Sequence, residues 1–209
     1  MARQIGSVCR LCRREGMKLF LKGIRCTGDK CAIERRNFVP GMHGRGQRTK
    51  LSEYGNQLRD KQKMKKIYGV LERQFHLFFR RAAQMTGVTG ETLIELHERR
   101  LDNVVYRLLF VTSRRSGRQL VQHGHVFVNG RPVTIPSYVV EQGDSISVRK
   151  RDHVQKMVRD TLDMLKDRPI PEWLAVDREL LEGKVLRAPT KREAGLPVEE
   201  SHIVELYSK

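Results

Sequence analysis

The feature that most constrains the fold is a capped helix followed at once by a tight hairpin in the middle of the chain. Ser113 is a favourable helix N-cap, and Gly124 is typical of the residue that ends a helix. The dipeptide Asn129-Gly130 fits a two-residue hairpin turn, because both central positions of such a turn require a positive φ. The sequence therefore predicts a helix over 114–123 and a hairpin with one buried face. Apolar residues that would form this face alternate on both sides of the turn, at Val126, Val128, Val133 and Ile135.

The polar positions of this helix and hairpin are mostly cationic. A small rigid fold that exposes Arg and His is suited to phosphate groups, because phosphate contacts position a protein on nucleic acid. We therefore predict RNA contacts from Arg114, Arg115, Arg118, Gln119, His123, His125 and Arg131.

The charge of the whole chain supports a polyanionic partner. The 209 residues include 41 Lys and Arg against 24 Asp and Glu, which gives a net charge of +17. Such a charge repels itself unless a polyanion neutralises it. No apolar run approaches the roughly 18 residues that span a bilayer, so we expect a cytoplasmic protein without a membrane partner. The charge is +10 over 1–50, +2 over 51–98, +6 over 99–153 and −1 over 154–209, which indicates two basic modules and a neutral tail.

The first basic module contains all four cysteines, at Cys9, Cys12, Cys26 and Cys31. Two close pairs separated by a loop are the spacing that tetrahedral thiolate ligation of zinc requires. An iron–sulfur cluster uses the same ligands, and four reduced thiols without a metal are a third interpretation. With four protein ligands, any metal here would be structural, because no open position remains for catalysis.

Further RNA contacts are predicted in the first third of the chain. The segment 37–50 is rich in glycine and cations and has little to pack, so RNA contact is the favoured interpretation of its His43. A basic helix face follows the N-cap Ser52. The predicted RNA-binding residues of this region are Arg3, Arg13, Arg14, Lys22, Arg35, Arg36, His43, Arg45, Arg48, Lys50, Arg59, Lys61, Lys63, Lys65 and Lys66.

Hydrophobic periodicity predicts an α+β fold that is mainly helical. Apolar positions at helical spacing indicate one helix after Gly69, a second from Thr89 to about Leu108, and a third after a strand at 145–149. Trp173 is expected to anchor the tail, and the alternating segment 202–207 suits a short strand or a protein contact. We divide the chain into a cysteine and loop region (1–50), a helical domain (51–98), a helix and hairpin domain (99–153), and a helix and tail that pack back on the helical domain (154–209).

The sequence carries no recognisable catalytic motif. Walker, nucleophile-elbow, zincin and Rossmann patterns are missing. Asp102 could suggest pseudouridine-type chemistry, but it lies within an amphipathic helix beside Arg99 and Arg100, which favours a salt bridge. We therefore predict a binding protein rather than an enzyme. A DNA-binding zinc-ribbon regulator is also compatible with the charge and the cysteines.

Several segments, in order along the chain, resemble the family of bacterial small ribosomal subunit protein four. They include Pro40-Gly41-Met42-His43-Gly44, Ser52-Glu53-Tyr54-Gly55, Ile67-Tyr68-Gly69-Val70-Leu71 and Arg100-Leu101-Asp102-Asn103-Val104-Val105-Tyr106-Arg107. The helix and hairpin region resembles the small RNA-binding domain named after that family, which also occurs in pseudouridine synthases and tyrosyl-tRNA synthetases.

This resemblance implies a structural ribosomal protein that binds 16S rRNA directly and nucleates assembly of its 5′ domain. It implies that the hairpin domain is inserted between two parts of the helical domain. It also implies contact with small-subunit ribosomal protein five, an interface associated with translational accuracy. The loop with Arg45, Arg48 and Lys50 would lie near the channel through which mRNA enters the subunit. Family members differ in whether they keep the cysteines, and this chain has all four.

Overall fold

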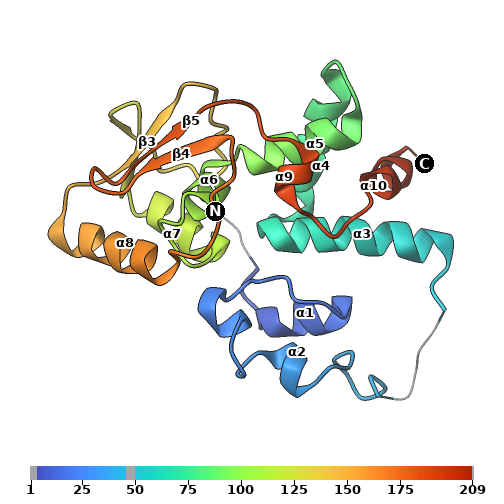
Figure 1. Ribbon diagram of the computed structural model, residues 1–209. Helices are drawn as coiled ribbons and strands as arrows, with labels where there is room; N and C mark the ends of the chain where they lie inside the picture. Colours follow the sequence, from blue (N-terminus) through green and yellow to red (C-terminus); the bar gives the residue numbers. More distant parts are fainter. Residues whose placement is uncertain (1–3, 46–49, 209) are drawn as a thin grey trace. The chain divides into compact units, whose positions relative to one another are not determined.

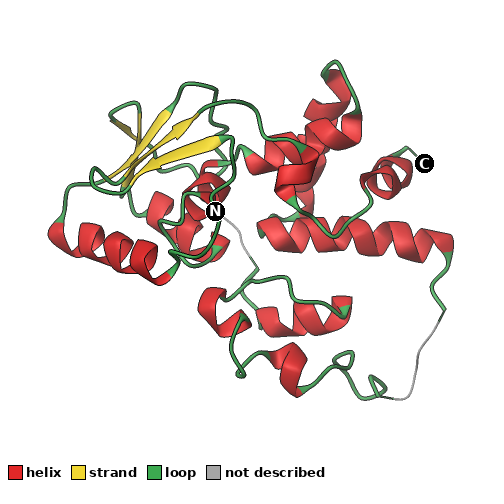
Figure 2. Ribbon diagram, viewed as in Figure 1, coloured by secondary structure: helices red, strands yellow, loops and turns green. Residues whose placement is uncertain are grey.

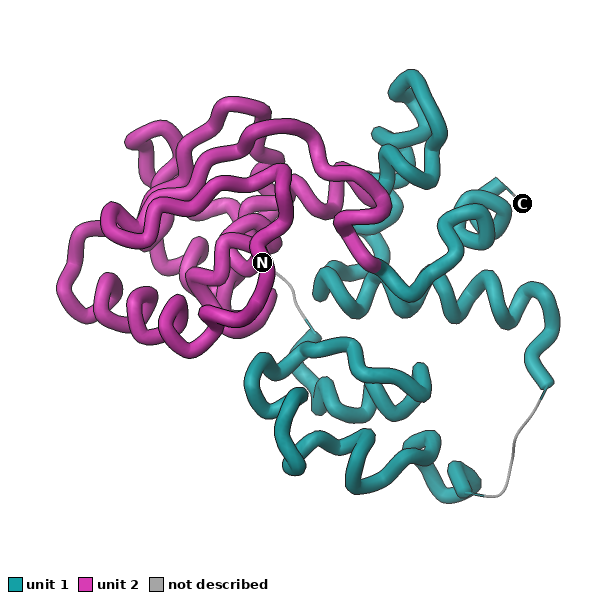
Figure 3. Tube along the Cα trace, viewed as in Figure 1, with its two compact units in different colours: residues 1–93, 196–209 teal, residues 94–195 magenta. Residues whose placement is uncertain are grey.

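The computed structural model describes residues 4–45 and 50–208 as two compact units with a mixed α+β architecture (Figures 1 and 2). Unit 1 comprises residues 1–93 and 196–209, and unit 2 comprises residues 94–195 (Figure 3). Unit 2 is therefore inserted in the sequence of unit 1, whose last segment returns from the far end of the chain.

All the regular elements in the described part of unit 1 are helices. Ser52 caps its longest helix, because the Ser52 side chain accepts a hydrogen bond from the Gly55 N–H at 3.2 Å. Gly69 ends the same helix in the left-handed conformation, with φ 65°. The elements of unit 1 are α1 (Val8–Glu15), the 3₁₀ helix η1 (Gly23–Cys26), α2 (Ala32–Arg35), α3 (Glu53–Tyr68), α4 (Glu72–Gln84), the first half of α5 (Thr89–Glu98) and α10 (Glu200–Tyr207).

The C-terminal segment forms the helix α10 and packs on α3, so the short strand, one of the two interpretations left open for 202–207, is not formed. Ile203 is fully buried, and Tyr207 lies against the rings of His76 and Phe79 of α4 at 5.4 and 4.5 Å between centroids. A helix presents both positions to unit 1 because they are four residues apart on one face. The apparent alternation along the segment does not decide its conformation, because partners distant in sequence do.

Unit 2 contains a five-stranded antiparallel sheet with the strand order β2-β1-β3-β5-β4. Helices α6, α7 and α8 lie beside this sheet (Figure 1). The strands are β1 (Val126–Val128), β2 (Arg131–Pro132), β3 (Ser145–Val148), β4 (Leu174–Asp177) and β5 (Glu182–Val185). The helices are the second half of α5, α6 (Leu101–Arg107), α7 (Arg114–Gln122), α8 (Asp152–Met164) and α9 (Lys191–Ala194).

The predicted capped helix and hairpin are confirmed. The Ser113 side chain accepts a hydrogen bond from the Ser116 N–H at 3.2 Å, and α7 follows. Asn129 and Gly130 have φ values of 51° and 75°, as a primed two-residue turn requires. Val126 and Val128 are buried and Val133 is half-buried, but Ile135 is 55% exposed. The buried face of the hairpin is therefore shorter than predicted, because β2 already ends at Pro132.

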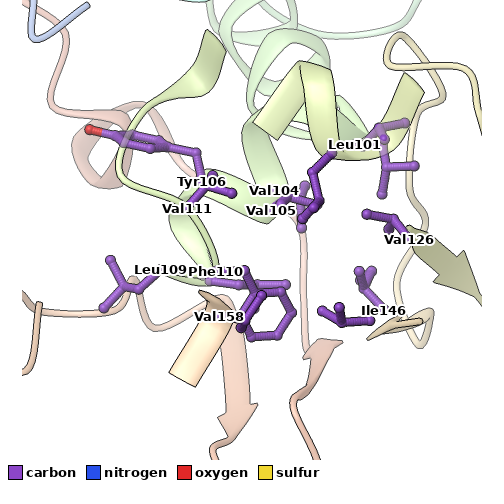
Figure 4. Packing of buried hydrophobic residues seen from close by; sticks show 14 of the residues in the cluster. Leu101, Val104, Val105, Tyr106, Leu109, Phe110, Val111, Val126, Ile146 and Val158 are labelled. Carbon is purple, nitrogen blue, oxygen red and sulfur yellow. The ribbon is translucent and has the colours of Figure 1, made fainter. Parts of the chain in front are cut away.

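The core of unit 2 joins the sheet to α6, α7 and α8. Figure 4 shows the side chains of Val126 and Ile146 from the strands, Val104 and Val105 from α6, and Val158 from α8 in one cluster. Each of these five side chains is fully buried. Full burial of a valine or isoleucine contributes roughly 1.5–3 kcal/mol relative to exposure, so this cluster makes a large contribution to the stability of the unit.

Two boundaries differ from the sequence prediction. The continuous helix predicted from Thr89 to about Leu108 is wrong, because Arg100 is extended (φ −64°, ψ 134°) and separates α5 from α6. The Leu101 N–H donates to the Tyr138 oxygen at 2.8 Å, so the backbone exchanges a helical hydrogen bond for a contact with a later segment. The predicted boundary at residue 153 also differs from the units. Strands β4 and β5 extend the sheet of β1 and β3, so residues up to 195 belong to unit 2, where Trp173 is fully buried.

Candidate nucleic-acid interface

The four cysteines lie together in unit 1. Cys12, Cys26 and Cys31 are buried, Cys9 is half-buried, and all four are free thiols that line one cavity of about 20 Å³. The backbone N–H of Lys22 donates to the Cys26 sulfur at 3.3 Å. Burial raises the pKa of the Cys12 thiol, and the other three sulfurs add to this effect because like charges repel.

The chemistry of this pocket fits a soft metal ion. Lys22, Arg25 and Lys30 also line it, and their charges would offset the negative charge of four thiolates. The donor set is therefore suitable, although residues 4–45 and 50–208 contain no group of three or more His, Cys, Asp or Glu side chains already placed as metal ligands.

Arginines from two segments surround the ring of Phe38. The guanidinium carbons of Arg13 and Arg45 lie 4.6 and 4.8 Å from the ring centroid, and the Arg13 Nε donates to the Phe38 oxygen at 3.0 Å. Cation–π contacts of this kind contribute roughly 0.5–1 kcal/mol each at exposed sites. They fix one turn of the glycine-rich segment beside α1.

The basic face of α3 is paired within the protein. Lys61 and Lys65 each donate to the Glu72 carboxylate at 2.7 Å, and Lys63 donates to Asp60 at 2.9 Å. The α3 residues Arg59 and Lys66 both bind the buried carboxylate of Glu15, at 3.2 Å for Arg59. Burial acts to raise the pKa of Glu72, but hydrogen bonds from Lys61, Lys65 and Tyr207 outweigh it and lower the pKa to about 2.

The arginines of α7 point in two directions. The Arg114 Nε donates to Asn103 Oδ1 at 2.7 Å, and its guanidinium carbon lies 4.6 Å from the centroid of the Tyr106 ring. Arg118 is 6% exposed and lies 3.7 Å from the Asp102 carboxylate, which is itself bound by Arg100 at 2.6 Å. The predicted salt-bridge role of Asp102 is confirmed. Arg114 and Arg118 therefore lie against α6, and Arg115 is exposed.

The predicted RNA-binding residues thus separate into an exposed set and a partnered set. Arg3 and Arg48 lie outside the described residues. Those that we call the partnered set already bind other groups of their own unit: Arg13, Arg59, Lys61, Lys63, Lys65, Lys66, Arg114 and Arg118. Those that we call the exposed set present their side chains to solvent: Arg14, Lys22, Arg35, Arg36, His43, Arg45 and Lys50 in unit 1, and Arg115, Gln119, His123 and Arg131 in unit 2. His125 is half-buried.

Three further cationic or titratable residues, which the sequence analysis did not predict as RNA contacts, lie between the end of β3 and the first turn of α8. Arg149 is half-buried, whereas Arg151 and His153 are exposed. His153 lies next to His125, with ring centroids 6.2 Å apart. The available signal was the run Arg149-Lys150-Arg151-Asp152-His153, which contains three consecutive basic residues and begins at the last residue of the predicted strand.

Two domain families match the chain in succession. Residues 3–98 match the Ribosomal protein S4/S9 N-terminal domain, and residues 99–146 match the S4 domain. The two matches, together with the basic surfaces of both units, define the class of protein: a non-enzymatic RNA-binding component of the ribosome.

Full-length relatives specify the family. The chain is 56% identical to "Small ribosomal subunit protein uS4" of Halothermothrix orenii, 54% identical to that of Trichlorobacter lovleyi and 55% identical to that of Acidobacterium capsulatum. Each comparison covers 100% of both chains. The chain therefore belongs to the family of small ribosomal subunit protein uS4, as its sequence motifs predicted. It is a structural, rRNA-binding protein of the small ribosomal subunit.

The structure also bears on membrane association. Within residues 4–45 and 50–208, no helix combines the length and the apolar composition needed to cross a bilayer.

Proposed function

We propose that this protein is a primary binder of 16S rRNA that nucleates assembly of the 5′ domain of the small ribosomal subunit. The observation that carries the proposal is the exposed set, which both units contribute. Two units with separate cationic surfaces can bind phosphates of different RNA helices and reduce the repulsion between them. Specificity comes from the shape of a helix junction, because side chains cannot read the narrow major groove of A-form RNA.

A salt series tests this proposal. Each neutralised phosphate releases counterions, so log K should fall with log salt by roughly 0.7 to 0.9 per phosphate contact. Filter binding of the full chain to a 16S rRNA 5′-domain transcript at several salt concentrations measures the slope. A flat response, or equal affinity for a scrambled transcript of the same length, contradicts the proposal.

Contacts beyond rRNA form the second part of the proposal. Arg45 and Lys50 are exposed and belong to the segment that would face the channel where mRNA enters the subunit. The segment 154–209 has a net charge of −1, which suits a protein partner better than RNA. We assign small-subunit ribosomal protein five as that partner, with an influence on translational accuracy. Loss of protein five from subunits that carry substitutions on the exposed face of α10 would support this assignment, and normal incorporation would oppose it.

The cysteine cavity is proposed to hold zinc in a structural role. Cys9, Cys12, Cys26 and Cys31 would supply four thiolates, and the cationic residues around them would compensate the charge. An iron–sulfur cluster is the alternative cofactor with the same ligands. Metal analysis of the purified full chain distinguishes the two, and a Cys26→Ser variant that retains the metal would contradict the assignment of ligands.

A further inference from the structure

Three histidines from different elements of unit 2 form a compact cluster. His123 follows the C-terminal end of α7, His125 precedes β1, and His153 lies in the first turn of α8. The ring of His125 lies between the other two, with centroids 6.1 Å from His123 and 6.2 Å from His153 in edge-on arrangements. His123 and His153 are exposed, so a ligand can reach the cluster from solvent.

One ring nitrogen of the half-buried His125 lacks a hydrogen-bond partner. Its Nδ1 atom is buried and has no hydrogen-bond partner among the described residues. A buried polar atom without a partner is unfavourable, because it has lost its hydrogen bonds to water. Its backbone is held firmly, because the Arg149 N–H donates to the His125 oxygen at 2.8 Å and the His125 N–H donates to the Leu120 oxygen at 3.2 Å. The backbone of His125 is therefore held at both its N–H and its oxygen, while the Nδ1 atom of its ring has no partner.

The surroundings of the cluster favour an anion over a metal cation. Arg149 and Arg151, from the segment between β3 and α8, act on His125 as positive charges. The carboxylate of the first turn of α8 is Asp152, which is exposed. Arg151 is the N-cap of α8 and makes no side-chain capping bond, so the partial positive charge of this helix end adds to that of the arginines. A cation would be repelled here, and a phosphate would be attracted.

We infer that His123, His125 and His153, together with Arg149 and Arg151, form a phosphodiester-binding site of unit 2 that takes up protons when RNA binds. The inference rests on the proposed rRNA binding and adds a proton-linked site to it. Non-bridging phosphate oxygens accept from ring nitrogens of the exposed His123 and His153, the negative charge of the phosphate favours the charged form of the neighbouring His125, and the proton that charges a ring comes from solvent.

The electrostatics of the free and bound states give the direction of the linkage. In the free protein, burial and the positive charges of Arg151, His123, His153 and Arg149 lower the pKa of His125 below its ordinary value. A bound phosphate reverses the sign of the local field and favours the charged imidazolium. RNA affinity should therefore rise as the pH falls. The expected increase between pH 8 and pH 6 is roughly three- to tenfold for each histidine that gains a proton.

The test measures affinity of the full chain for the 16S rRNA 5′-domain transcript at pH 6, 7 and 8 and constant ionic strength. The wild type should bind more tightly at pH 6, and titration calorimetry in two buffers of different ionisation enthalpy should show proton uptake. The double variant His125→Gln/His153→Gln should lose most of this pH dependence. His153→Lys supplies a fixed charge, so it should keep the affinity at pH 8 and reduce the pH dependence.

A control variant shows whether the pH dependence comes from this histidine cluster, and three results would contradict the inference or the proposed function. His76→Gln removes a histidine of unit 1 that stacks on Tyr207, and it should leave the pH dependence unchanged. A double variant with the melting temperature and the pH dependence of the wild type would overturn the inference. So would a rise in melting temperature on addition of Zn²⁺ or Ni²⁺ alone that the double variant lacks, because it would identify a cation site. Absence of RNA binding at every pH would contradict the proposed function instead.

Discussion

At the scale of the residue, three arginines of one helix that look equivalent in the sequence have different surroundings in the folded chain. Arg114 and Arg118 are held by Asn103 and Asp102 of α6, whereas Arg115 is exposed. A side chain already committed to a buried carboxylate contributes to stability, and an exposed one is available to phosphate. The cationic character of α7 therefore serves both the core of unit 2 and its surface.

Single alanine substitutions should separate these roles. Arg115→Ala should change the stability by no more than about 0.5 kcal/mol and weaken RNA binding, because an exposed side chain makes few contacts in the protein. Arg118→Ala should lower the stability by about 1–3 kcal/mol, because it removes a buried partner of Asp102. Urea unfolding followed by the fluorescence of Trp173, the only tryptophan and a core residue of unit 2, measures the change. Equal unfolding midpoints for the two variants would contradict the different roles of Arg115 and Arg118.

The same contrast shows what sequence can predict at this scale. The residue types that favour RNA were identifiable from composition and local pattern. Their partners were not, because the pairing residues lie on different elements of the fold: Lys66 of α3 binds Glu15 of α1, and Lys61 of α3 binds Glu72 of α4. An apparently solvated basic face of α3 is thus largely neutralised by carboxylates that only the fold brings close.

At the scale of the element, the local signals predicted best where local chemistry decides the backbone. The Ser113 cap and the Asn129-Gly130 turn were found, because a cap and a primed turn depend on the residues within them. The break at Arg100 was missed, because it depends on hydrogen bonds to a segment almost forty residues later, such as Leu101 to Tyr138. The helix α10 was missed for the same reason.

The packing of α7 on α6 depends on one glycine. A Cβ at Gly117 would lie 2.6 Å from the backbone oxygen of Asp102, which cannot move without displacing α6. Gly117→Ala should therefore lower the stability by about 1–2 kcal/mol, although alanine favours a helix by about 1 kcal/mol. Trp173 fluorescence during urea unfolding measures the stability of unit 2 in this variant. Gly55→Ala in α3 is the control, because its Cβ would approach only side-chain atoms, at 3.4 Å; since Gly55 lies in unit 1, far-ultraviolet circular dichroism follows the unfolding of this variant. An unchanged or higher midpoint for Gly117→Ala would refute the prediction.

The contact between α10 and α3 should depend on pH. His202 Nδ1 lies 2.6 Å from Asp60, and this hydrogen bond raises the pKa of His202. A raised pKa in the folded state means that the contribution is complete below the ordinary histidine pKa and is lost as the pH rises through the raised value. His202→Gln should therefore lower the stability more at pH 5.5 than at pH 8.5, as measured by far-ultraviolet circular dichroism during urea unfolding.

Lys63→Gln provides the control for this prediction. Lys63 binds the same Asp60 at 2.9 Å, but lysine stays charged across this pH range. The cost of Lys63→Gln should therefore be similar at both pH values. A pH-independent cost of His202→Gln would show that the ion pair with Asp60 does not stabilise the folded chain.

At the scale of the whole molecule, the net charge of +17 coexists with two folded units because carboxylates are placed where they neutralise buried or crowded cations. Glu15, Glu72 and Asp102 each bind two cationic side chains within their unit. Among the described residues, exposed cationic side chains of both units, such as Arg35 and Arg115, are available to a polyanion. The class of partner followed from composition alone, whereas the division between internal and external charge required the fold.

The chain order of the units gives the last prediction. Unit 1 is completed by residues 196–209, whose contacts include Gln57 with Glu205 at 2.7 Å and Tyr207 with Glu72 at 2.8 Å. A chain that ends at Gly195 lacks these contacts, so amides of α3 and α4 should exchange hydrogen faster, while those of β1 and β3 should be unaffected. Exchange followed by mass spectrometry measures both. Tyr207→Phe, which removes only the hydroxyl bond to Glu72, should give a smaller increase at α4. Equal acceleration in the strands would mean that the two units unfold together.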